Sequence, residues 1–199
     1  MARRQRSERG AVAVEAALVT PLLMLLVFGI IEMSLLMRDA SGVTNQVRAA
    51  ARIAATEAGA GTPVSATTPT LADDAVNAIQ NAGSSMPLSS VNWVLVYQAN
   101  QYGYPLPATN TSSVTCTTNC IKYVWSAASN KFIKSSGSWA TSTINACVND
   151  PNRQSVGVAM SAKHTWVTGL FGAGVDVPAR LMMQFEPLPA TTCASGNHP

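Results

Sequence analysis

A long apolar run dominates the amino-terminal part of the chain. No charged residue lies between Glu15 and Glu32, and the apolar character extends outward to about residues 11 and 37. This length exceeds the roughly 20 residues that a helix needs to cross a lipid bilayer. We therefore expect a transmembrane helix at residues 11–37.

The helical pattern continues after the apolar run. Val43, Val47, Ala51 and Ala54 recur at steps of three and four residues, which is the spacing of one helix face. At 1.5 Å per residue, a helix from about residue 11 to about residue 57 would be roughly 70 Å long, and only about 30 Å of it fits in hydrocarbon. We expect residues 38–58 to form a helical stalk outside the bilayer.

The remaining sequence, residues 59–199, alternates between helical and strand patterns. Thr70 and Asp73 resemble a capping box that opens a helix, and Gly83 closes it. From Pro87 onward the apolar period changes to two, as in strands. The strands are expected at residues 91–98, 123–125, 131–134, 156–166 and 175–185, the second and third forming a hairpin. This order predicts an α+β head with an antiparallel four- to five-stranded sheet, carried on the long amino-terminal helix.

Charge is concentrated before the apolar run. The net charge is +3, and four arginines against one glutamate stand in residues 1–10, so that the rest of the chain is balanced. Because cytoplasmic flanks are enriched in basic residues, we expect residues 1–10 to be a cytoplasmic leader at the inner membrane, with the carboxyl-terminal domain outside. The neutral body gives no electrostatic support for binding nucleic acid. A cleaved secretory signal is disfavoured because the run is too long.

Four cysteines, Cys116, Cys120, Cys147 and Cys193, all follow the apolar run. An even number on that side suits disulfides in an oxidising compartment. Three pairings are possible. We prefer Cys116 with Cys120, which closes a short loop, and Cys147 with Cys193, which ties down the tail. A redox dithiol is less favoured because the CxxC pattern is absent.

The junction between leader and helix carries a family resemblance. A glycine, Gly10, stands one residue before the apolar run, and an acid, Glu15, follows five residues later. RRQRSERG followed by AVAVEAALVTPLLMLLVFGIIEMSLLM resembles the amino end of the TadE-like pseudopilins, minor components of the tight-adherence (Flp-type) pilus system. The later segments VRAAARIAAT, SVGVAMSAKHTWVTGLFG and VPARLMMQFEP agree with it.

The resemblance implies a site and a set of partners. A prepilin peptidase would cleave after Gly10, the mature chain would begin at Ala11, and Glu15 would become its fifth residue. A carboxylate inside the apolar run costs on the order of 2 to 3 kcal/mol toward the middle of a bilayer. The resemblance implies that it pairs with the α-amino group of a neighbouring subunit, which offsets this cost. The expected partners are other pilin subunits, the assembly machinery and the membrane, without a cofactor.

Other polar and aromatic residues have plainer explanations. We expect Glu32 to be solvated at the outer interface and His164 to pack beside Trp166. The turn containing Leu170 and Phe171 is either a docking surface or a buried cap, and burial is slightly favoured. No residues stand at metal-ligand spacing and no catalytic set is visible, so an enzyme is not expected.

The leading hypothesis is thus a non-enzymatic minor pilin or pseudopilin. The alternative is a permanently membrane-anchored extracytoplasmic domain that binds a protein or a glycan. In that alternative Glu15 lies near the cytoplasmic interface, stabilised by water or by Arg9. A thiol oxidoreductase ranks third.

Overall fold

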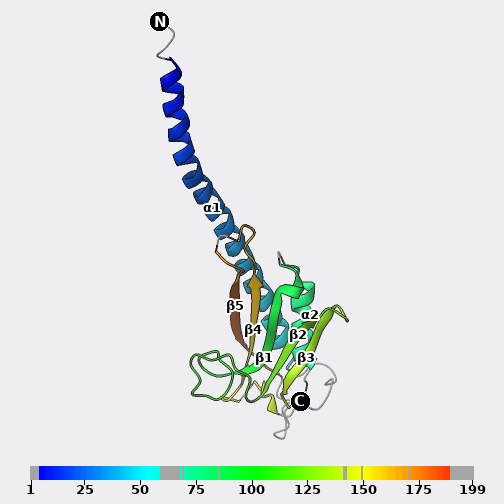
Figure 1. Ribbon diagram of the computed structural model, residues 1–199. Helices are drawn as coiled ribbons and strands as arrows, with labels where there is room; N and C mark the ends of the chain where they lie inside the picture. Colours follow the sequence, from blue (N-terminus) through cyan, green and yellow to red (C-terminus); the bar gives the residue numbers. More distant parts are fainter. Residues whose placement is uncertain are drawn as a thin grey trace.

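A computed structural model of the chain describes residues 5–58, 68, 70–84, 86–140, 143–148, 150–169 and 171–188, with only the backbone for residues 5–9. The molecule has two visibly different parts, a long helix and a compact head at its carboxyl-terminal end (Figure 1). The helix α1, Gln5–Thr56, has 52 residues and contains Pro21 without interruption. At 1.5 Å per residue it is roughly 80 Å long.

The head combines a second helix with one antiparallel sheet. The helix is α2, Thr70–Asn81, and a short 3-10 turn, η1, Leu88–Ser90, leads into the first strand. The strands are β1, Val91–Ala99; β2, Cys120–Ser126; β3, Lys131–Ser138; β4, Ser155–His164; and β5, Val175–Gln184. Their order across the sheet is β3-β2-β1-β4-β5. The predicted α+β architecture is confirmed, with five strands.

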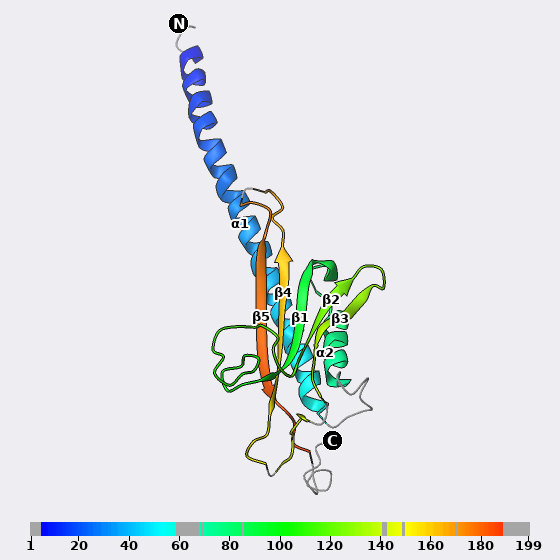
Figure 2. The same ribbon diagram turned by 60° about the horizontal axis from the view of Figure 1, so that its bottom comes forward.

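The carboxyl-terminal part of α1 and all of α2 cover one face of the sheet (Figure 2). Their contact is built from small side chains, because α1 presents a stripe of alanines that lets the two helices and the sheet approach closely. The buried residues of this stripe are Val43, Val47, Ala50, Ala51, Ala54, Ala55 and Ala58. The segment expected as a stalk, residues 38–58, thus contributes to the core of the head.

The central strand β1 is buried on both faces. Val94 and Val96 face the helices, whereas Leu95 and Tyr97 belong to a second cluster on the opposite face. The loop that follows β1 covers this second cluster, and the Tyr97 hydroxyl donates a 2.9 Å hydrogen bond to the carbonyl of Gly103. Simple alternation of buried and exposed residues is therefore lost in the middle of β1.

Strands β4 and β5 form a hairpin that is paired along its whole length. The register runs from Ser155 opposite Gln184 to His164 opposite Val175. The connection between them, residues 165–174, is named here the β4–β5 loop. In both ribbon views this loop is the part of the head closest to the projecting part of α1 (Figures 1 and 2).

Candidate functional site: the exposed helix and its junction with the head

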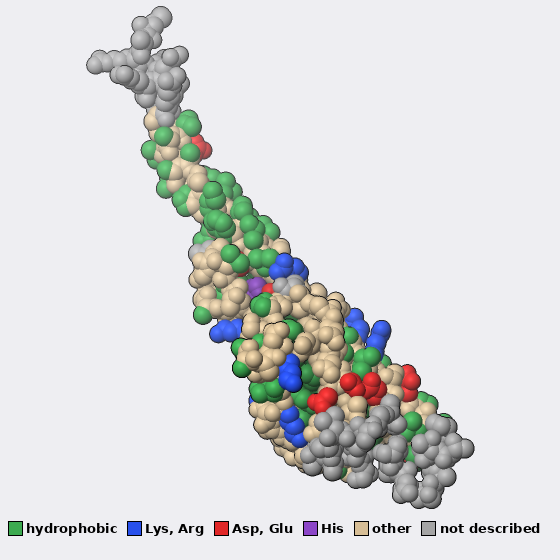
Figure 3. Space-filling view, turned by 90° about the vertical axis from the view of Figure 1, so that its right-hand side faces the viewer, with side chains coloured by type: hydrophobic (Ala, Val, Ile, Leu, Met, Phe, Trp, Pro, Cys, Tyr) green, Lys and Arg blue, Asp and Glu red, His purple; other side chains and the backbone are tan. Residues whose placement is uncertain are grey.

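The amino-terminal part of α1 is uncovered on all sides. From Ala11 to Ile31 the side chains are exposed, apart from the half-buried Gly29. The most apolar 18-residue window of the helix has a mean hydropathy of 2.4, and none of it is buried. Figure 3 shows hydrophobic side chains along the visible face of this part of the helix, down to the head. A helix that is apolar all round needs an apolar surrounding, which indicates membrane anchoring.

The proposed processing and pairing residues all lie on this uncovered part. Gly10, Ala11 and Glu15 are helical and exposed. Small residues, Ala13 and Ala17, lie one turn apart on the same surface, an arrangement that lets two membrane helices approach closely. Cleavage after Gly10 and pairing of Glu15 with another subunit stay predictions.

Glu32 begins the buried part of α1, and its expected solvation is wrong. Its side chain is fully buried against the β4–β5 loop. The carboxylate accepts hydrogen bonds from the backbone N–H of Thr168 at 2.6 Å, from the Thr168 hydroxyl at 2.7 Å and from the backbone N–H of Val167 at 3.2 Å. The physical reason is that the loop turns its N–H groups toward the helix, where an acceptor must satisfy them.

A second acid on the same helix face holds the start of the loop. Asp39 lies two turns after Glu32, and its Oδ2 is 2.7 Å from Nδ1 of His164, the last residue of β4. Both side chains are buried. The ring of His164 stands edge-on to Trp166, with centroids 4.8 Å apart. The expected packing against Trp166 is therefore present, but the contact with Asp39 was not predicted.

The sequence did contain a signal for these contacts. Glu32, Asp39 and Gln46 follow one another at intervals of seven residues, and all three are buried. Residues seven apart occupy the same face of a helix. These positions extend the buried stripe of Val43 and Val47 toward the amino terminus, so the polar residues mark where the head begins to cover the helix.

The outer surface of the β4–β5 loop is apolar and exposed. Val167 is 75% exposed and Phe171 is 55% exposed, so the slight preference for a buried loop is wrong for Phe171. The ring of Phe171 packs on Trp166, with centroids 5.4 Å apart. Leu170 lies outside the described residues. The sequence could not distinguish a buried loop from an exposed one because this turn has no helical or strand period.

Two of the cysteines form a disulfide in the described part of the head. Cys116 and Cys120 form the expected disulfide, which borders the cluster around Tyr97. Cys193 lies outside the described residues, so the pairing of Cys147 with Cys193 stays a prediction. The disulfide fastens the loop after β1 to the first residue of β2.

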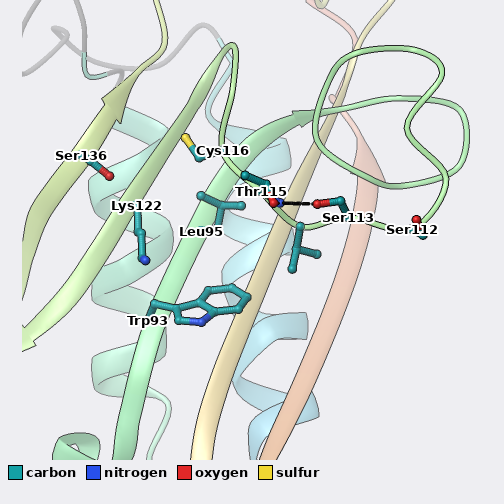
Figure 4. A pocket seen from close by; sticks show the side chains of 9 residues that line it. Trp93, Leu95, Ser112, Ser113, Thr115, Cys116, Lys122 and Ser136 are labelled. Carbon is teal, nitrogen blue, oxygen red and sulfur yellow. Dashed lines mark hydrogen bonds between the residues drawn. The ribbon is translucent and has the colours of Figure 1, made fainter.

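A cleft on the sheet face opposite the helices is a second candidate site. Figure 4 shows Trp93 and Leu95 of β1 and Lys122 of β2 as its floor, with the segment Ser112–Cys116 along one side. Its volume is about 660 Å³. The hydroxyls of Ser113 and Thr115 hydrogen-bond to each other at 2.6 Å across its rim. An aromatic ring beside hydroxyl groups and one amine can hold a polar ligand.

Comparison with known proteins concerns α1. The sequence model of the family described as TadE-like protein matches residues 10–52. The matched segment contains the uncovered helix and the two acids that bind the β4–β5 loop, Glu32 and Asp39. No curated protein and no solved structure matches the chain.

Proposed function

We propose that this protein, whose amino-terminal helix is TadE-like, is a minor pilin or pseudopilin that takes part in assembling a tight-adherence pilus. The observation that carries the proposal is the combination of a TadE-like sequence with an apolar helix that nothing covers from Ala11 to Ile31. A subunit of this kind stays in the bilayer through the helix until partner helices replace the lipid. The protein acts by assembly and not by catalysis.

In this proposal the leader and the helix have separate roles. Residues 1–10 stay in the cytoplasm and orient the chain, because basic residues are retained on that side. A prepilin peptidase cleaves after Gly10. Ala13 and Ala17 then allow another subunit's helix to come close.

Glu15 would be the residue that selects the neighbouring subunit. After cleavage a new α-amino group exists at Ala11 of each chain, and a carboxylate in apolar surroundings gains most from a partner of opposite charge. The exposed position of Glu15 among Val12, Val14 and Leu18 supports an intermolecular contact. A carboxylate among exposed apolar side chains favours a neighbouring subunit that places a positively charged group, such as the α-amino group, beside it.

Processing is tested by the intact mass of the chain purified from membranes that also contain the peptidase. The proposal expects a chain beginning at Ala11, and expects Gly10→Val to keep the full length. Gly29→Val is the matched control, because a Cβ added at either glycine meets no described atom within 4 Å. Recovery of the uncleaved parent would contradict processing.

Pairing is tested separately by co-purification with the other pilus components. Glu15→Gln keeps the size of the side chain and removes its charge, so we expect a folded head and reduced recovery of the partners. Glu186→Gln, which changes an exposed acid of the head, serves as control. Equal recovery of partners with both variants would refute the role of Glu15.

The cleft beside Trp93 favours one alternative, a membrane-anchored domain that binds a protein or a glycan outside the cell. In that case the chain remains uncleaved and binding depends on the head alone. The mass measurement separates the two functions. Trp93→Ala would then abolish ligand binding while leaving membrane anchoring intact.

A further inference from the structure

We propose that the β4–β5 loop is a lipid-contacting surface that seats the head on the outer face of the bilayer. Val167 and Phe171 would lie in the headgroup layer. The proposal rests on membrane anchoring of α1 and does not depend on the pilus role. It concerns the head before any transfer of the helix out of the membrane.

The position of the loop along α1 supports this placement. Glu32 binds the loop through Val167 and Thr168, and Glu32 also ends the uncharged run that starts after Glu15. Glu32 follows Glu15 by 17 positions, which is roughly 25 Å of helix and close to the roughly 30 Å thickness of bilayer hydrocarbon. The loop is therefore fastened to the helix at the level where the hydrocarbon ends.

The composition of the loop suits the headgroup layer. No Asp, Glu, Lys or Arg occurs between Lys163 and Asp176, and among the described residues of this segment the large apolar side chains with the greatest exposure are Val167 and Phe171. Its backbone turns through Gly169 and Gly172, both at positive φ. Such irregular backbone needs polar partners, which headgroups and water supply and hydrocarbon does not.

The surroundings of the loop continue the same surface. Met33 and Met37 are exposed on α1 at the level of Glu32 and Asp39, so the helix still presents apolar side chains at the height where the loop is bound. Two exposed cations lie near its border, Arg38 on the helix and Lys163 at the end of β4. Interfacial tryptophan, tyrosine, lysine and arginine side chains anchor the ends of membrane-spanning segments.

The contacts beneath the loop fix its orientation. Glu32 holds the middle of the loop and Asp39 holds His164 at its start, while Trp166 packs between His164 and Phe171. The exposed side chains are thus presented by a supported structure. A lipid surface is the occupant that this geometry favours, because the same helix that carries the loop is the one that enters the bilayer.

Fluorescence quenching in lipid nanodiscs tests the proposal with the full chain. One copy is placed in each disc of phosphatidylethanolamine and phosphatidylglycerol, with a tryptophan-free scaffold, and the acyl chains are either unbrominated or brominated both near the headgroup and deeper along the chain. Tryptophan is introduced as Phe171→Trp, in a Trp166→Phe background that removes the fluorescence of the neighbouring indole. The emission of the background protein is subtracted.

Two matched variants complete the experiment. Leu22→Trp lies in the uncovered helix, and Tyr102→Trp lies after β1, at the end of the sheet away from the β4–β5 loop; both parent side chains are exposed. We expect brominated lipid to remove the added emission of Phe171→Trp and Leu22→Trp and to spare that of Tyr102→Trp.

Each other outcome overturns the proposal in a distinguishable way. If Phe171→Trp behaves like Tyr102→Trp while Leu22→Trp is quenched, the loop faces water or a protein and not lipid. If Leu22→Trp is also unquenched, α1 is not in the bilayer and the premise of anchoring fails. Neither result depends on cleavage after Gly10 or on pilus partners.

Discussion

The two parts of α1 show that hydropathy and burial are different properties. Residues 11–31 are the more apolar part and are almost wholly exposed, whereas residues 32–58 contain acids, glutamine and many alanines and supply the core of the head. The difference lies in the pattern. Apolar residues confined to one face pack on a sheet, and apolar residues on every face call for lipid or for other helices.

The largest expected effects come from placing an arginine in each part. Val47→Arg puts an unpaired charge into a fully buried site and should destabilise the head by about 4 kcal/mol or more. Leu22→Arg should instead weaken membrane insertion, by about 3 kcal/mol, and leave the head intact. Thermal unfolding in detergent and the membrane-bound fraction report the two effects. A loss of head stability with Leu22→Arg would show that the uncovered part of α1 also contributes to the fold of the head.

Enlarging one alanine in each part sharpens the comparison further. Ala51 of α1 is fully buried against the rest of the head, so Ala51→Leu should overpack the core and lower the free energy of unfolding by about 1 to 3 kcal/mol. Ala17→Leu is the control on the exposed part. In denaturant titrations of the detergent-solubilised protein, Ala17→Leu should have the same unfolding midpoint as the parent. If both variants lowered the midpoint, Ala17 would not lie on an exposed part of the helix.

The contact between α1 and the start of the β4–β5 loop should be sensitive to the loss of a single charge. Asp39→Asn removes the charge that faces Nδ1 of His164 at 2.7 Å, and we expect a loss of about 1 to 3 kcal/mol in unfolding free energy. Arg38→Ala is the neighbouring control. Its guanidinium contacts Asp39 at 3.5 Å but is largely exposed, so its removal should cost under about 1 kcal/mol. Equal effects would show that Asp39 acts through Arg38.

The smallest expected effect is a pH dependence of stability that arises from Glu57, just after the carboxyl-terminal end of α1. Burial, together with a hydrogen bond to Asp74 and the charge of Asp74, raises the pKa of Glu57 to about 7. The folded state thus binds this proton more tightly than the unfolded state does. The resulting stabilisation is complete below about pH 4.5, the ordinary pKa of the group, and is lost as the pH rises through about 7.

Melting temperatures at pH 5 and pH 8 measure this contribution. The parent should melt at a lower temperature at pH 8, and Glu57→Gln should reduce the difference. Glu186→Gln is the matched substitution of an exposed acid. An unchanged difference with Glu57→Gln would remove Glu57 from the explanation of any pH dependence.

The elements of the fold were predictable because they follow local periodicity. Both helices and all five strands overlap the predicted segments, and β2 and β3 form the expected hairpin. β2 begins three residues earlier than predicted and β3 ends four residues later. The contacts of Glu32 and His164 were not predictable in the same way. Their partners lie 136 and 125 residues away, and local periodicity carries no information about which loop returns to a helix.

Of the candidate site, the uncovered helix was predictable from the sequence, whereas the exposure of the β4–β5 loop was not. The uncovered helix could be identified from residue types and spacing, whereas the roles of Gly10 and Glu15 come from the family resemblance and stay predictions. The exposure of Phe171 depends on how Glu32 and Trp166 support the β4–β5 loop, which only three-dimensional packing reveals. The interval of seven that links Glu32, Asp39 and Gln46 was the one available clue.

The continuity of α1 has a mechanical consequence. The same hydrogen-bonded rod that forms the core of the head extends into the apolar anchor, without an intervening linker. A pull or a twist applied to the head is therefore carried directly to the anchor instead of being absorbed by a flexible joint. Head and anchor move as one lever, and work done outside the bilayer acts on the part within it.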